Sequence, residues 1–226
     1  SSIAVTVTGT PLGLLNQIIW SRESSELGKS VSRHKKPFDQ KESYKWYDGI
    51  TSVNKMLAGD VNKIHIGDRD ADIYELFFNS PAEKADLLIR ARHDRKTASG
   101  SQLWQHISEQ KIATQEVIII PDRTGKRKKE VEVQIRYKEV EILCPIKKKG
   151  TIYESVVLTA IEIRQSGNTK DGIHWQLLTT LPIKNAEEAS QCMRWYSYRW
   201  LIERFHYVLK SGCGIESLQL KQAQSM

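Results

Sequence analysis

The sequence lacks long apolar segments and contains few cysteines. No apolar run approaches the roughly 18 to 20 residues that cross a bilayer, so no membrane-spanning helix is predicted. The three cysteines, Cys144, Cys192 and Cys213, form no CxxC pair, and their odd number favours a reduced cytosolic protein over a disulfide framework. The first residues lack the basic start of a secretory signal. Because the first residue is Ser rather than Met, we expect the chain to be a piece of a longer protein.

Positive charge is in excess. The 226 residues include 34 Lys and Arg against 27 Asp and Glu, which gives a net charge of +7 and a pI near 9.2. This balance favours a polyanionic partner such as nucleic acid, although many basic proteins bind none. The length allows one sizeable core or two small domains.

The first half of the chain alternates between strand and helix patterns. Residues 2–9 and 11–23 read as a hairpin, and residues 24–40 are polar and rich in turn formers, as in a loop. The later patterns predict a helix over 41–59, a short buried strand over 61–68, a helix over 70–80 and a strand over 85–92.

The second half begins with a β-rich segment. Strands are predicted at 114–120, 129–137, 153–163 and 174–182, and the basic clusters at 126–129 and 147–149 are predicted to be solvated hairpin tips. From residue 185 to about 211 the pattern is helical again. We therefore expect an α/β core interrupted by an antiparallel β insertion. The predicted parts are core residues 1–111, insertion residues 112–184 and a closing segment over 185–226.

The predicted closing helix carries an ordered polar stripe. At about 100° per residue, Tyr196, Arg199, Glu203 and Lys210 share a stripe about 60° wide. The opposite face, predicted to contact the core, consists of Tyr198, Leu201, Ile202, Phe205, Val208 and Leu209. A solvated face with an Arg199–Glu203 pair, worth a few tenths of a kcal/mol, is the alternative. That alternative does not explain why the other two polar residues are aligned.

Asp68 follows the buried strand predicted over 61–68. The carboxyl ends of such strands are where α/β folds place ligands, and a carboxylate there suits Mg²⁺, which prefers oxygen ligands. The alternative is that Asp68 or Asp70 caps the helix that follows.

The chain resembles the cut-and-paste insertion-sequence transposases of the DDE type, the insertion-sequence-4 group. Its four-residue stripe matches the signature Y-x2-R-x3-E-x6-K, and GDRDADIYE at 67–75 resembles the second-aspartate motif. Three further segments, KESYKW, IRARHDRK and HWQLLTT, fall in the matching order, so the resemblance covers nearly the whole chain. It implies a ribonuclease H-like fold: a mixed sheet with flanking helices and an antiparallel β insertion before the last catalytic helix.

The resemblance also implies the chemistry. Two Mg²⁺ ions, for which Mn²⁺ can substitute, would be held about 3.5–4 Å apart by three carboxylates and would activate a water or a DNA 3′-hydroxyl. Asp68 and Glu203 correspond to the second and third of these carboxylates. The first has no counterpart here and is expected upstream of Ser1, so this chain alone is expected to be inactive.

Further roles are implied for basic and aromatic residues. Arg199 and Lys210 would grip phosphates near the scissile bond, and Tyr196 would hydrogen-bond a phosphate oxygen. Trp175 would stack on a base flipped from the duplex end in a hairpin route; ordinary core packing is its alternative. The residues expected to position the DNA backbone, unless they form only a basic loop, are Arg90, Arg92, Arg95 and Lys96.

The resemblance therefore implies the catalytic core of a bacterial transposase. It would nick transposon ends and join the 3′-hydroxyl to double-stranded target DNA, as a homodimer in the synaptic complex, in the cytoplasm and on the nucleoid when DNA-bound. Two alternatives remain open: an inactive transposase remnant that binds DNA, and a ribonuclease H-like nuclease without strand transfer.

Overall fold

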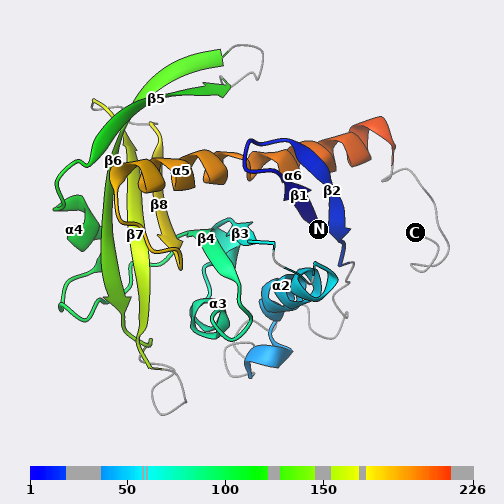
Figure 1. The fold of residues 1–226 in the computed structure, drawn as a ribbon, viewed down its shortest axis with the longest axis horizontal. Helices are drawn as coiled ribbons and strands as arrows, with labels where there is room; N and C mark the ends of the chain where they lie inside the picture. Colours follow the sequence, from blue (N-terminus) through cyan, green and yellow to red (C-terminus); the bar gives the residue numbers. More distant parts are fainter. Residues whose placement is uncertain are drawn as a thin grey trace, which may run out of the picture.

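The computed structural model describes residues 1–18, 37–57, 59, 61–121, 128–145, 154–167 and 172–214. These residues form a two-stranded sheet of β1 (Ser2–Val5) and β2 (Pro11–Asn16), and a six-stranded sheet of order β3-β4-β8-β7-β6-β5 (Figure 1). Among the described residues, no helix is long and apolar enough to cross a membrane.

The larger sheet is mixed. Its strands are β3 (Ile64–Gly67), β4 (Asp86–Arg90), β5 (Thr114–Pro121), β6 (Lys128–Ile142), β7 (Val156–Gln165) and β8 (His174–Thr179). Only the β3–β4 ladder is parallel. The helices are α2 (Tyr44–Met56), α3 (Tyr74–Asn79), α4 (Leu103–Ser108), α5 (Ala186–Ser197) and α6 (Trp200–Tyr207). Short turns are η2 (Phe38–Gln40), η3 (Arg69–Ala71) and the π-helical η5 (Val208–Gly212). This mixed sheet flanked by helices confirms the predicted class and is consistent with a ribonuclease H-like transposase fold.

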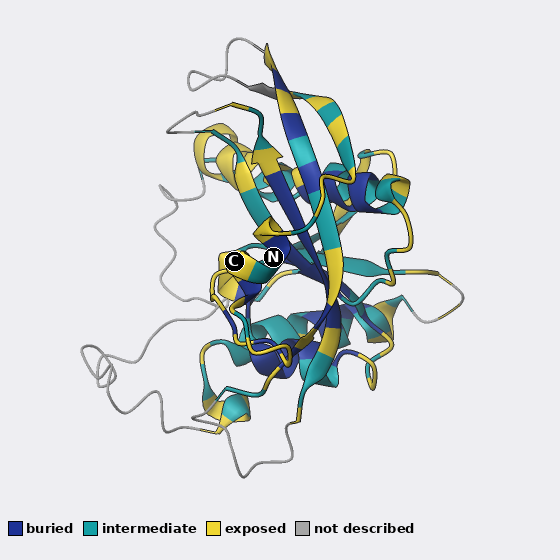
Figure 2. Ribbon diagram, turned by 90° about the vertical axis from the view of Figure 1, so that its left-hand side faces the viewer, coloured by how far each residue is buried: buried dark blue, intermediate teal, exposed yellow. Residues whose placement is uncertain are grey.

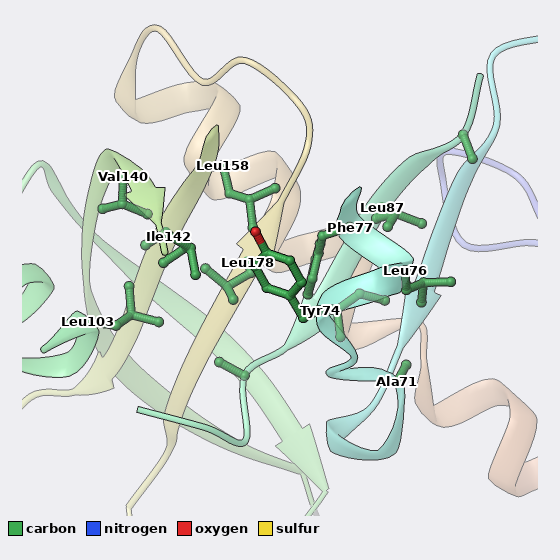
Figure 3. Packing of buried hydrophobic residues seen from close by; sticks show 14 of the residues in the cluster. Ala71, Tyr74, Leu76, Phe77, Leu87, Leu103, Val140, Ile142, Leu158 and Leu178 are labelled. Atoms are coloured by element: carbon green, nitrogen blue, oxygen red, sulfur yellow. The ribbon is translucent and has the colours of Figure 1, made fainter. Parts of the chain in front are cut away.

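Helices pack on both faces of the central strands. Successive residues of a strand point to opposite faces, so each central strand contributes to two apolar layers. Leu87 and Ile89 of β4 pack with α3 and α4, whereas Leu88 between them packs with α5. Figure 3 shows the first of these clusters, where Phe77 of α3 lies near Leu178 of β8. Figure 2 shows the buried residues as continuous tracts along the central strands.

The 15-residue strand β6 contributes to both cores. In its first half Val131, Val133 and Ile135 are buried in the α5 cluster, and near its end Val140 and Ile142 are buried in the cluster of α3 and α4. The odd and even positions of one strand thus stabilise opposite layers.

The β-rich segment continues the core sheet. Hydrogen-bonded pairing joins Leu88, Ile89 and Arg90 of β4 to Thr179, Leu178 and Leu177 of β8. The predicted antiparallel order of its four strands is confirmed. The boundary at residue 112 and the three-part division stay predictions.

Two helix predictions need correction, and one helix was missed. The helix predicted over 70–80 is split into η3 and α3, and Asp72 between them is buried. Helix α4 was not predicted. Most of the loop at 24–40 and most of the two basic clusters lie outside the described residues.

The uninterrupted helix predicted over 196–210 is wrong. The amides of Tyr198, Arg199 and Leu201 bond to carbonyls three residues earlier, at 3.0, 3.0 and 2.9 Å, so the chain tightens between α5 and α6. The ring of Tyr198 packs on the β1–β2 turn, where a Cβ added to Gly9 would lie 2.8 Å from Cε1 of Tyr198.

The predicted polar stripe and apolar face hold only in part: Leu201, Ile202, Phe205 and Leu209 of the apolar face are half-buried. Tyr196 is 3% exposed, whereas Glu203 and Lys210 are exposed. No residue of α6 is buried, and Val208 just beyond it is 54% exposed. Helix α6 extends beyond the six-stranded sheet, beside the β1–β2 hairpin (Figure 1).

Replacing Gly67 by alanine should destabilise the fold by about 1–3 kcal/mol. A Cβ at this buried end of β3 would lie 2.6 Å from Ala71 Cβ and 2.8 Å from Ile89 Cδ1. The free energy of unfolding in urea measures the effect. Gly49→Ala is the control: it meets nothing within 4 Å in α2 and should raise stability by up to about 1 kcal/mol. Equal stability of the two variants would contradict the close packing around Gly67.

Candidate active site

Asp68 stands at the carboxyl end of β3, where the parallel β3–β4 pair directs the chain out of the sheet. Its Oδ1 accepts a hydrogen bond of 2.9 Å from the amide of Asp70, so it caps η3. The alternative role predicted for Asp68, as a cap of the helical turn that follows, is therefore observed. A carboxylate has a second oxygen, so the cap leaves Asp68 able to bind a further ligand.

Glu203 lies in the first turn of α6 and forms an ion pair with Arg199, with 2.7 Å between Oε1 and Nη2. Burial pulls the pKa of the Arg199 guanidinium down. The hydrogen bond to Glu203 and the electrostatic attraction of Tyr196, Glu203 and Asp68 more than offset this, and the net pKa shift is upward. Both candidate carboxylates therefore act on the same guanidinium.

Tyr196 is buried beneath two guanidinium groups. Burial raises the pKa of its phenol, while the charges of Arg90 and Arg199 and their hydrogen bonds lower it. A guanidinium only donates, so the Tyr196 oxygen accepts from both arginines. Burial also lowers the pKa of Arg90, in the same direction as the charges of Arg69 and Arg199. Tyr196 thus holds two cations near the carboxylates.

Trp175 of β8 lies on the same face of the sheet as Tyr196. Its ring meets the Tyr196 ring edge to face, with centroids 5.2 Å apart and planes at 67°. Trp175 is half-buried and packs against the α5 cluster. Part of the Trp175 side chain therefore packs in the core, as the alternative predicted, and its stacking on a base stays a prediction.

The loop after β4 is organised by Asp72. Its Oδ2 accepts from the amides of Arg92 and His93 at 2.6 and 2.9 Å, and its Oδ1 lies 2.6 Å from Nη1 of Arg95. Arg95 is 9% exposed, so its guanidinium orders the loop. Arg92 and Lys96 are exposed, and Arg92 pairs with Asp70 at 3.2 Å.

The structure brings six of the ten predicted site residues into one connected group: Asp68, Arg90, Trp175, Tyr196, Arg199 and Glu203. Arg92 and Lys96 lie on the adjoining loop, Arg95 is buried beside Asp72, and Lys210 is exposed on η5. Two residues of this region were missed, Arg69 and Asp72. The spacing of Asp68, Asp70 and Asp72 was the available signal for Asp72, because residues two positions apart do not share one face of a helix.

Oxygen donors of this kind suit Mg²⁺. Among the described residues, no cluster of three or more His, Cys, Asp or Glu side chains could hold a metal ion. Asp68 and Glu203 are two carboxylates that both favour the positive charge of Arg199. Their chemistry fits a divalent cation, and their number fits part of a two-metal site.

The model of the transposase DDE domain family matches residues 48–225. The chain belongs to the transposase DDE domain family. The match includes every predicted site residue, from Asp68 to Lys210. The family's enzymes act on DNA and generally use divalent metal ions. The transposase prediction is therefore confirmed at the level of the family.

Replacing Asp72 by alanine should cost about 3–5 kcal/mol of folding free energy, because Arg95 would be left buried without its partner. Urea unfolding measures this. Asp70→Ala is the matched control: it breaks the exposed pair with Arg92 and should cost less than about 1 kcal/mol. A small loss for Asp72→Ala would show that the loop does not depend on this anchor.

Proposed function

We propose that the chain is the catalytic core of an insertion-sequence-4 type transposase. It hydrolyses a phosphodiester at each transposon end and joins the freed 3′-hydroxyl to target DNA. The observation that carries the proposal is that Glu203 pairs with Arg199 at 2.7 Å and that the charge of Asp68, 135 positions earlier in the numbering, raises the pKa of the same guanidinium. Such convergence is what a site for a divalent cation requires.

In this proposal Asp68 and Glu203 supply carboxylate oxygens to magnesium. When bound, the metal supplies Lewis acidity and lowers the pKa of a water or a hydroxyl. The third carboxylate of the family pattern would come from a strand beside β3. Among the described residues, β3 has a ladder partner on one edge only.

The basic groups of the site bind and orient DNA. Arg199 presents a planar fork that suits a phosphate, and Lys210 adds a point charge. The Tyr196 hydroxyl accepts from two arginines and still has one proton to donate to a phosphate oxygen. Arg92 and Lys96 extend this surface along the loop after β4 and contact the backbone without reading sequence. Arg95 is not part of this DNA-binding surface because its guanidinium binds Asp72.

Two other functions fit the same fold. An inactive remnant would bind DNA through the basic surface without cleaving it, and a ribonuclease H-like nuclease would cleave without joining strands. A nicking and strand-transfer assay with the full-length protein and its element's end separates all three. We further propose that the full-length protein acts as a homodimer at paired ends.

Replacing Glu203 by alanine in the full-length protein should lower nicking by more than about 100-fold in Mg²⁺. End binding should persist, because the change releases Arg199 from its ion pair. Nicking of a labelled end and gel-shift binding measure the two effects. The control is Glu187→Ala, which removes an exposed glutamate paired with Arg194 on α5 and should keep both activities. If Glu203→Ala lost binding together with nicking, Glu203 would have a structural role.

Replacing Trp175 by alanine should impair hairpin formation more than the first nick. The indole would stack on a flipped base, and a stacked base is worth about 1–3 kcal/mol. Single-turnover assays that resolve nicked and hairpin products measure the ratio, with Trp175→Phe as the variant that keeps a ring against Tyr196. Equal loss of both steps would leave Trp175 with core packing alone.

A further inference from the structure

Two neighbouring rows of polar side chains cross β6, β7 and β8 on the face of the sheet opposite α5. The first row, in register, consists of Gln134, Arg164 and His174, and the second consists of Arg136, Glu162 and Gln176. The residues between them, Ile163 and Trp175, belong to the α5 face. Strand β8 thus presents Trp175 on the α5 face of the sheet and the imidazole of His174 on the opposite face.

Glu162 is the acidic centre of these rows. Its side chain is 2% exposed, and its two oxygens bind different partners: Oε2 lies 3.1 Å from Nη1 of Arg136, and Oε1 lies 3.0 Å from Nε2 of His174. Burial raises the pKa of this carboxyl. The hydrogen bond and charge of His174 and the charges of Arg136 and Arg164 lower this pKa by more than burial raises it, so the net pKa shift is downward. Glu162 is therefore an anionic acceptor.

This acceptor fixes how the imidazole of His174 is presented. Because Glu162 accepts, Nε2 donates, and Nδ1 is the remaining polar atom of the ring. The side chain is 49% exposed, and the exposed Arg164 is its directly paired neighbour on β7. A neutral imidazole can only accept at Nδ1, whereas a protonated one donates there and attracts an anion.

His174 adjoins the candidate active site. Its carbonyl oxygen accepts a 3.1 Å hydrogen bond from Nη2 of Arg90, which also bonds Tyr196. The next residue, Trp175, contacts the Tyr196 ring. The start of β8 thus places an aromatic ring on one face of the sheet and an imidazole with a guanidinium on the other.

We propose that His174 and Arg164 bind a DNA backbone phosphate on the face of β8 opposite Trp175, and that His174 takes up a proton when it does so. The proposal rests on the proposed action on DNA. Four charged groups belong to this neighbourhood: Glu162 contacts the His174 ring, Arg164 is its cross-strand neighbour on β7, Arg136 on β6 binds Glu162, and Arg90 on β4 binds the His174 carbonyl. A phosphate adds negative charge beside the ring, which favours the imidazolium form. Affinity for DNA therefore rises as pH falls through the range in which imidazoles titrate.

The test measures binding of this chain to a fluorescein-labelled 30-base-pair duplex by anisotropy, from pH 5.5 to 8, at several salt concentrations. His174→Gln keeps a donor for Glu162 but cannot be protonated, and His174→Lys carries a charge throughout this range. His106→Gln is the matched control, because His106 on α4 contacts Ser101 rather than a carboxylate. Melting temperatures confirm that each variant is folded.

We expect the ratio of affinity at pH 6 to affinity at pH 8 to fall about fivefold in His174→Gln, with a salt slope at pH 6 lower by about one. His174→Lys should bind at pH 8 as the parent chain does at pH 6, and His106→Gln should match the parent chain. DNA binding whose pH ratio and salt slope are unchanged in His174→Gln overturns the proposal and leaves the proposed function intact. Absence of duplex binding at every pH also overturns the proposal, while the proposed function is tested separately by the nicking assay with the full-length protein.

Discussion

The ladder between β4 and β8 is the contact on which the candidate site depends. Strand β4 is paired on one side with β3, which ends at Asp68, and on the other with β8, which begins at His174 and Trp175. Thr179 Oγ1 donates to the Leu87 carbonyl at 2.6 Å, and the Ala91 amide donates to the Gln176 carbonyl at 2.7 Å. Both ends of this short ladder are therefore fixed by hydrogen bonds, and residues separated by more than 100 positions meet at one edge.

Helix α5 is the second support of the site. Ala189, Cys192, Met193 and Tyr196 are buried against the sheet, which fixes where α5 ends. Beyond it, after the tightened turn, α6 continues past the sheet (Figure 1). Glu203 can then approach Arg199 and the region of Asp68 without being buried itself. The exposed Glu203 is thus accessible to a metal ion that would take the place of Arg199.

The sequence was sufficient for the strands and for the main acidic and basic residues, because these follow from alternation and from short motifs. Alternate burial in Val131, Val133 and Ile135 marks a strand whatever lies beside it. The break at Tyr198 and Arg199 was not predictable, because both residues are compatible with a helix. At this turn the Tyr198 ring rests on Gly9, almost 190 positions away, a tertiary contact that the local pattern does not contain. The burial of Arg95 could not be predicted for a similar reason: its partner Asp72 is separated from it in the sequence by α3 and β4.

The charges of Arg69 and Arg199 both act on Arg90, and Arg90 and Arg199 each lose solvation by partial burial. Such a concentration of positive charge is costly for an isolated domain and becomes favourable when a polyanion is bound. The Tyr196 oxygen, Glu203 and Asp68 offset part of that cost in the free protein. A phosphate entering the site would take over the role of these acceptors for the arginines, and the carboxylates would then be released toward a metal ion. The charges that stabilise the free fold are thus the groups that a DNA backbone and a divalent cation would divide between them.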